Sequence, residues 1–199
     1  KTSPFYFDCR RTTMLAEAMP LIGKLVYERI HGAVSAVGGL TMGADPIACA
    51  VAFYSATREA PIAAFSVRKA AKVHGRQQWV EGAVSPKAKV AIVEDVVTSG
   101  ASTLEAIARC RAEGLRVERV VVLVDREEGG MERIAAEVGA ERASSVFVRS
   151  QIDEIWRRSR ERSGPPRHAA VIPCPPRPID PRSPRLAGYE AQPRLLRRS

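Results

Sequence analysis

The chain has 199 residues, of which 45% are hydrophobic and 27% are charged, and its formal net charge is +9. This composition is ordinary for a globular protein, and the length suits one domain with a sizeable core and leaves no room for a second catalytic domain. No apolar run is long enough to cross a bilayer and no secretory signal is present, so the sequence argues against a membrane protein and we expect a cytoplasmic one.

The positive charge is concentrated in the last part of the chain. Residues 157–199 hold eleven arginines against three acidic residues, a net of +8, which leaves +1 for residues 1–156. Nine of the 14 prolines lie in the same stretch, where they interrupt helix and sheet hydrogen bonding. We therefore expect a folded domain over residues 1–156 and a Pro/Arg-rich, disordered tail over residues 157–199. Attraction of this tail to nucleic acid is the less favoured interpretation.

Apolar periodicity within residues 1–156 predicts alternating helices and strands. The expected helices cover residues 14–30, with a break or kink at Pro20, then 45–56, 102 to a stop at Gly114, and 131–138. The expected strands cover residues 33–37, 62–67, 117–124 and 144–148, with one more that begins at Val90. Such alternation is typical of a parallel sheet covered on both faces, which binds ligands at the carboxyl ends of its strands.

The most informative segment is residues 90–103, which read VAIVEDVVTSGAST. An apolar strand ends in Glu94 and Asp95, and a loop rich in hydroxyl groups then leads into a helix. Ser102 and Glu105 have the spacing of a capping box, which predicts that the helix starts at Ser102. A phosphate in the loop would meet free backbone N–H groups at the positive end of the helix dipole.

The two carboxylates next to this loop indicate what the phosphate belongs to. They would repel a phosphate, but they suit ribose hydroxyls or a Mg²⁺ ion shared with a phosphate. The segment therefore predicts a site for a phosphorylated sugar. No Gly-Lys-Ser/Thr loop is present, so ATP hydrolysis is not the first expectation.

The order and spacing of this segment resemble the PRPP-binding signature of the type I phosphoribosyltransferases. The resemblance implies an α/β fold with a central, mostly parallel sheet flanked by helices and with a mobile catalytic loop. It also implies that PRPP is bound by Glu94, Asp95, Val96, Val97, Thr98, Ser99, Gly100, Ala101 and Ser102.

A basic loop after the expected strand 62–67 indicates which of the type I phosphoribosyltransferases the chain resembles. Arg68, Lys69, Lys72 and His74 are followed by Gly75, and four cationic or protonatable groups this close together suit a pyrophosphate leaving group. The segment resembles the mobile catalytic loop of the orotate phosphoribosyltransferases. By that resemblance all four residues bind PRPP, and Lys72 and His74 are catalytic together with Asp95.

Two further matches to the family concern the binding of the orotate base. Residues 3–8 resemble the family's Ser-Pro-aromatic segment, in which Tyr6 and Phe7 would pack against the flat orotate ring. Arg126 follows an apolar strand and matches the arginine that binds the orotate carboxylate, a group that a guanidinium can hold with two hydrogen bonds. The resemblance also places Thr98 against orotate.

Residues 37–46 correspond to the family's pyrophosphate-binding loop. Their three glycines, Gly38, Gly39 and Gly43, would let backbone amides approach an anion. Met42 stands where many members have a lysine, and this stretch of sequence resembles a bacterial subgroup that lacks the lysine.

The chain enters the family pattern after its usual start, so we expect the family's N-terminal helical segment, with a lysine that contacts PRPP, to be missing.

The resemblance implies an orotate phosphoribosyltransferase that converts orotate and PRPP to orotidine 5′-phosphate and pyrophosphate in UMP biosynthesis. Mg²⁺ is the implied cofactor, held mainly by PRPP and not by a protein metal site. A homodimer is implied, in which the loop cations complete the neighbouring subunit's site.

Two other interpretations stay open. The first is a phosphoribosyltransferase for a purine or another pyrimidine, against which the basic loop and Arg126 argue. The second is a non-catalytic regulatory protein that senses PRPP or a nucleotide and uses its arginine-rich tail on nucleic acid. Lys72 and His74 argue against it, because a sensor has little need of a leaving-group loop.

Overall fold

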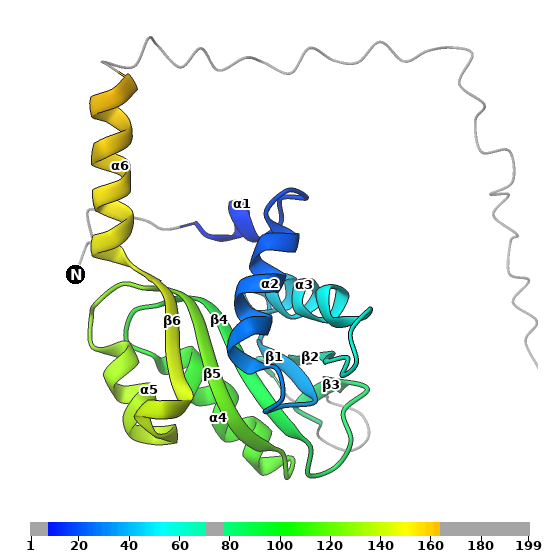
Figure 1. Ribbon diagram of the computed structural model, residues 1–199. Helices are drawn as coiled ribbons and strands as arrows, with labels where there is room; N and C mark the ends of the chain where they lie inside the picture. The colour runs from blue at the N-terminus through cyan, green and yellow to red at the C-terminus, as the bar shows by residue number, and fades with distance from the viewer. Residues whose placement is uncertain (1–7, 71–77, 164–199) are drawn as a thin grey trace, which may run out of the picture. The chain divides into compact units, whose positions relative to one another are not determined.

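The computed structural model describes residues 8–70 and 78–163, which form one six-stranded sheet with flanking helices (Figure 1). The strands are β1 (Ala36–Leu40), β2 (Ala63–Val67), β3 (Val80–Gly82), β4 (Lys89–Val97), β5 (Arg116–Asp125) and β6 (Ala143–Val148). Their order is β3-β2-β1-β4-β5-β6, and every neighbouring pair is parallel except β2 with β3. The predicted mostly parallel sheet is therefore confirmed.

The helices are α1 (Arg10–Thr13), α2 (Met19–Ile30), α3 (Asp45–Ser55), α4 (Ala101–Ala112), α5 (Gly130–Val138) and α6 (Arg149–Ser163), with a 3₁₀ turn at Ala140–Arg142. α2 and α3 cover one face of the sheet, and α4 and α5 cover the other (Figure 1). None of the helices in the described residues is long and apolar enough to cross a membrane.

The core consists of two apolar layers, one on each face of β4 and β5. Along β4, Val90 and Ile92 pack toward α4 and α5, whereas Ala91 and Val93 pack toward α2 and α3. A strand buried on both faces needs an unbroken apolar run, which is why this segment shows no polar alternation.

The carboxyl ends of four parallel strands lie at the same edge of the sheet. Leu40 pairs with Val67, and Val97 pairs with Asp125. The hydrogen bonding continues one residue further, from the Thr41 N–H to the Val67 carbonyl at 2.9 Å and from the Arg126 N–H to the Val97 carbonyl at 3.0 Å. The segments that carry the predicted site residues therefore begin side by side.

Several predicted boundaries are wrong. α2 begins at Met19 and not at residue 14, with Pro20 in its first turn, where the missing proline N–H costs no hydrogen bond. β1 covers Ala36–Leu40 and not residues 33–37. The predicted capping box is also wrong, because Gly100 adopts φ +76° and α4 already begins at Ala101 with no side chain capping it. The predicted stop at Gly114 is confirmed, at φ +79°.

α6 is an element that the sequence reasoning missed. It runs from Arg149 through Trp156 to Ser163, so the predicted domain boundary falls inside a helix. Charge pairs one turn apart, Arg149 with Asp153 and Glu154 with Arg158, support it although its mean hydropathy is low. Residues 157–163, the start of the predicted tail, are therefore helical, and residues 164–199 lie outside the described residues, so disorder of that part stays a prediction.

Gly38 and Gly39 lie inside β1, so the prediction that they belong to an anion-binding loop is wrong. A Cβ atom on Gly39 would lie 2.2 Å from the Val93 carbonyl oxygen, and one on Gly38 would lie 2.2 Å from the Phe65 carbonyl oxygen. These glycines allow β1 to fit against its neighbours, and of the three predicted glycines only Gly43 lies beyond the strand.

We expect Gly39→Ala to lower the free energy of unfolding by about 2–4 kcal/mol, because the added methyl group meets backbone atoms that cannot move aside. Gly114→Ala is the matched control. Its Cβ would meet nothing within 4 Å, so only the positive φ is strained, at a cost of about 1 kcal/mol. Urea unfolding followed by circular dichroism measures both, and equal losses would contradict the packing role of Gly39.

Candidate functional site

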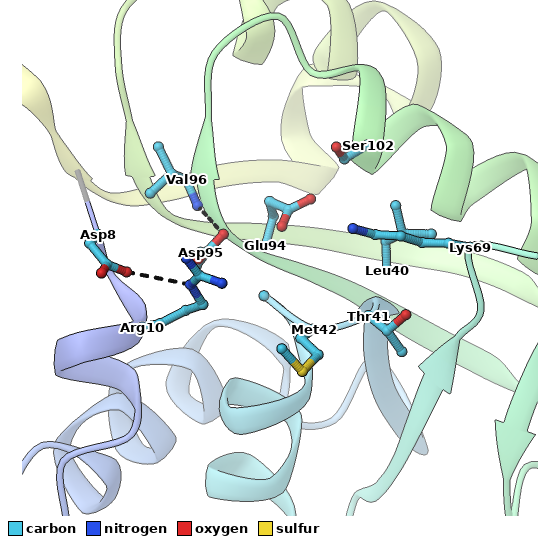
Figure 2. A pocket seen from close by; sticks show the side chains of 11 residues that line it. Asp8, Arg10, Leu40, Thr41, Met42, Lys69, Glu94, Asp95, Val96 and Ser102 are labelled. Carbon is cyan, nitrogen blue, oxygen red and sulfur yellow. Dashed lines mark hydrogen bonds and ion pairs between the residues drawn. The ribbon is translucent and has the colours of Figure 1, made fainter. Parts of the chain in front are cut away.

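A cavity of about 440 Å³ opens at the carboxyl edge of the sheet (Figure 2). Its lining comes from the segment at α1, the loop after β1, the residue after Arg68, the end of β4 and the first turn of α4. The lining residues are Asp8, Arg10, Leu40, Thr41, Met42, Gly43, Lys69, Glu94, Asp95, Val96 and Ser102. The structure thus brings together five of the residues predicted for PRPP, from two separate segments of the chain.

Glu94 and Asp95 stand where β4 leaves the core. Glu94 is 7% exposed, and burial, with the charge of Asp95 second, raises the pKa of its carboxyl to about 8. The Thr103 hydroxyl lies 3.5 Å from Glu94 Oε2, and Asp95 Oδ1 accepts the Val96 N–H at 2.8 Å. The site therefore combines a carboxyl that keeps its proton near neutral pH with an adjacent second carboxylate.

A smaller hollow of about 50 Å³ adjoins these carboxylates at the start of α4. It is lined by Glu94 and by residues 96–103, which include the whole predicted phosphate loop. The first turn of α4 contains no acidic residue. The hollow therefore offers an anion the N–H groups and the positive dipole end of a twelve-residue helix.

α5 packs against the predicted phosphate loop, residues 98–102, a contact that the sequence reasoning missed. A Cβ on Gly130 would lie 2.4 Å from the Thr98 carbonyl oxygen and 2.9 Å from the Gly100 nitrogen. One turn later, Arg133 Nη1 donates to the Ser99 carbonyl at 2.7 Å. The Gly129-Gly130 pair after β5 was the available signal, but the partner of those glycines could not be read from the sequence.

One end of the basic loop, at Lys69, lies at the cavity. Lys69 lines it, whereas Arg68 directs its guanidinium to Glu81 on β3 and is not among the lining residues. The Arg68 N–H donates to the Trp79 carbonyl at 2.9 Å, which joins the outgoing and returning strands of the loop. Lys72 and His74 lie outside the described residues, so their predicted roles stay predictions.

The predicted orotate residues are only partly described. Tyr6 and Phe7 lie outside the described residues. Arg126 follows β5 with its side chain 13% exposed and pairs with Glu128 at 2.8 Å, and Thr98 lines the phosphate hollow. Neither residue lines the larger cavity, so their contact with orotate stays a prediction.

Asp8 and Arg10 line the larger cavity although the sequence reasoning assigned them no role. Their side chains form an ion pair at 3.4 Å. Next to them, burial, followed by the charges of Asp95 and Asp8, raises the pKa of the Cys9 thiol to about 11. Asp8 is the last residue of the predicted orotate segment 3–8 and Arg10 follows it by two positions, and only this proximity could have suggested that they lie here.

Thr41, Met42 and Gly43 lie between β1 and α3, in the part of the predicted pyrophosphate segment 37–46 that is neither strand nor helix. All three line the cavity, and the peptide bond between Thr41 and Met42 is cis. The Met42 side chain is 59% exposed. Met42 therefore lies at the cavity, while a pyrophosphate-binding role of this loop stays a prediction.

Comparisons with known proteins agree with this geometry. The chain is 48% identical to the orotate phosphoribosyltransferase of Aquifex aeolicus over 138 residues, which cover 69% of this chain and 75% of that protein. It is 44% identical to the orotate phosphoribosyltransferase of Synechocystis over 131 residues, 65% of this chain and 66% of that protein. No protein-family model matches the chain.

Solved structures give the same result. The orotate phosphoribosyltransferase of Mycobacterium tuberculosis in complex with PRPP matches with a TM-score of 0.64 and 38% identity, over 74% of this chain and 82% of that one. A phosphoribosyltransferase from Corynebacterium diphtheriae matches with a TM-score of 0.67 and 37% identity, over 76% of this chain and 86% of that one. The chain belongs to the orotate phosphoribosyltransferase family, with the type I phosphoribosyltransferase fold.

Proposed function

We propose that this protein transfers the phosphoribosyl group of PRPP to orotate and releases pyrophosphate, as a step of UMP biosynthesis. The observation that carries the proposal is the arrangement at the end of β4. There, Glu94 lines both the hollow at the start of α4 and the larger cavity, and Asp95 and Lys69 line the larger cavity. PRPP has the same order of groups, with a ribose between a 5′-phosphate and a diphosphate.

The arrangement assigns a place to each part of PRPP. The 5′-phosphate would occupy the hollow of residues 98–102, where backbone N–H groups point at an anion. The ribose hydroxyls would lie at the two carboxyl groups, with protonated Glu94 able to donate a hydrogen bond and Asp95 able to accept one. The diphosphate would extend toward Lys69 and the Thr41–Gly43 loop.

The reaction breaks the bond between C1 of the ribose and the diphosphate oxygen and forms a bond from C1 to the orotate nitrogen. Positive charge develops on the ribose and negative charge on the leaving group. We assign the stabilisation of the leaving group to Lys69, Lys72 and His74, and that of the ribose to Asp95, whereas the Arg68 guanidinium would first have to leave Glu81 to reach the leaving group. Tyr6, Phe7, Thr98 and Arg126 would hold orotate.

Mg²⁺ fits this site only together with PRPP. Among the described residues no group of three or more His, Cys, Asp or Glu side chains could hold a metal ion. Asp95 would supply a carboxylate, and the diphosphate and ribose oxygens of PRPP would supply the remaining ligands that a hard cation prefers. When bound, Mg²⁺ would neutralise charge on the diphosphate.

We expect Lys72→Ala to lower kcat at least 100-fold, since a cation at the leaving group acts mainly on the transition state. The loss of orotate absorbance in the presence of PRPP and Mg²⁺ measures the rate. Lys24→Ala, an exposed lysine on α2, is the control and should be as active as the parent.

Three results would overturn this assignment. An unchanged rate in Lys72→Ala would contradict the loop mechanism. Activity with hypoxanthine, guanine or uracil but not with orotate would favour another base. PRPP binding without turnover in the parent would favour the sensor.

We also propose a homodimer in which each basic loop completes the neighbour's site, and mixing variants tests it. Lys72→Ala and Asp95→Asn subunits are each expected to be inactive alone. Unfolded together and refolded at equal concentrations, they should recover about a quarter of the parent rate, because half of the dimers are mixed and each mixed dimer has one intact site. No recovery would mean that each loop serves its own subunit.

The raised pKa of Glu94 gives a pH-dependent prediction. Between the ordinary pKa of 4.5 and the raised value of about 8, the folded protein holds a proton that the unfolded chain has lost. Stability contributed at position 94 is therefore fully present at low pH and is lost as the pH rises through this window. Glu94→Gln removes the titrating group but keeps a similar shape.

The free energy of unfolding of the parent relative to Glu94→Gln should fall by about 3 kcal/mol between pH 5.5 and pH 8. Urea unfolding at a series of pH values measures this difference. Glu28→Gln on the exposed surface of α2 is the control. A difference that stays constant with pH would show that Glu94 titrates normally.

A further inference from the structure

We propose that Arg109, in the middle of α4, is a positioning residue for Lys69 and thereby sets the affinity for the diphosphate end of PRPP. This inference rests on the proposed function, because it gives Lys69 a diphosphate to bind. Arg109 itself is not among the residues that line the cavity.

Arg109 contacts both ends of the basic loop. Its Nη1 donates to the Arg68 carbonyl, and its Nη2 donates to the Lys69 carbonyl at 3.1 Å. Its guanidinium carbon lies 4.2 Å from the centre of the Trp79 ring, on the returning side of the loop. One planar cation thus joins the two ends of a segment that leaves the sheet at Val67 and re-enters it at Val80.

Two glutamates complete this group, Glu105 within α4 and Glu113 at its C-cap. Glu105, one turn before Arg109, forms an ion pair with its guanidinium. Glu113, one turn after it, accepts the Trp79 N–H at 2.8 Å. Positions 105, 109 and 113 repeat at the spacing that places side chains along one face of a helix, so α4 presents a continuous polar stripe to the loop ends.

The guanidinium is well buried for a charged group. Its side chain is 14% exposed, although the Glu105 carboxyl is 49% exposed. Removing one partner of such a charged hydrogen bond leaves the other partner unsatisfied, which makes these contacts more important than a surface ion pair. A lysine could not replace them, because it lacks both the fork that reaches two carbonyls and the flat surface that stacks on Trp79.

α4 links the phosphate hollow to the Lys69 backbone. Its first turn forms the phosphate hollow, and Arg109 lies eight positions further along, which is about 12 Å in a helix. The Lys69 backbone is therefore fixed to the same rigid element that binds the 5′-phosphate. The distance between the two anion-binding groups of the site depends on α4 and on this guanidinium.

A double-mutant cycle on PRPP affinity tests the inference. We expect Arg109→Met to weaken PRPP binding in Mg²⁺ about tenfold by calorimetry, and Lys69→Ala to weaken it at least as much. If Arg109 acts through Lys69, adding Arg109→Met to Lys69→Ala should cost less than a further twofold. Arg111→Met, a second α4 arginine that pairs with Glu137 instead of the loop, should bind PRPP as the parent does.

Each outcome decides one question. Independent, multiplicative losses in the double variant would overturn the positioning role while leaving the proposed function standing. A parent that binds no PRPP would overturn both. Arg109→Lys keeps the charge and serves if Arg109→Met does not fold. It should also weaken binding several-fold, and parent-like binding by it would show that charge alone is needed and would overturn the geometric argument.

Discussion

Strand β4 is buried on both faces from Val90 to Glu94, and the site depends on where that burial ends. Helices must cover both faces of such a strand, so the chain alternates between strands and helices and all of the long strands run parallel. Parallel strands bring their carboxyl ends to one edge. Glu94 is the first polar side chain of β4 at that edge, and it is still almost as buried as the valine before it.

That burial raises the pKa of the Glu94 carboxyl above its ordinary value. Glu94 keeps its proton near neutral pH because solvent cannot stabilise its charge and because Asp95 lies next to it. Two adjacent ionised carboxylates would repel each other and would also repel a sugar phosphate in the loop that follows. A neutral carboxyl beside a second carboxylate provides both a donor and an acceptor for hydroxyl groups, with less repulsion of the phosphates on either side.

The fold class and the central motif could be predicted because both depend on residues that are close together in the sequence. The apolar run of β4, the stop at Gly114 and the strand before Arg126 each follow from neighbouring residues. The wrong prediction for Gly38 and Gly39 involves partners that are distant in the sequence. Gly38 and Gly39 resembled a loop because nothing local shows that Phe65 and Val93 lie against them.

The same reason explains what was missed at the site. Asp8 and Arg10 line the cavity together with residues that come much later in the sequence, such as Glu94. Arg68 belongs to the predicted cationic group, yet its guanidinium pairs with Glu81, which only the antiparallel strand β3 brings near. Composition can show that a segment is basic, but it cannot show which cation faces the substrate.

The close approach of β1 to β4 also limits how this sequence can change over evolutionary time. The atom that a side chain at position 39 would strike is the carbonyl oxygen of Val93, which every amino acid at position 93 would place there. Apolar core residues can be exchanged for one another when their neighbours adjust, so drift can rewrite much of the interior. No compensating substitution removes a backbone oxygen. Glycine at position 39 should therefore be inherited together with the strand order itself, while the side chains around it diverge.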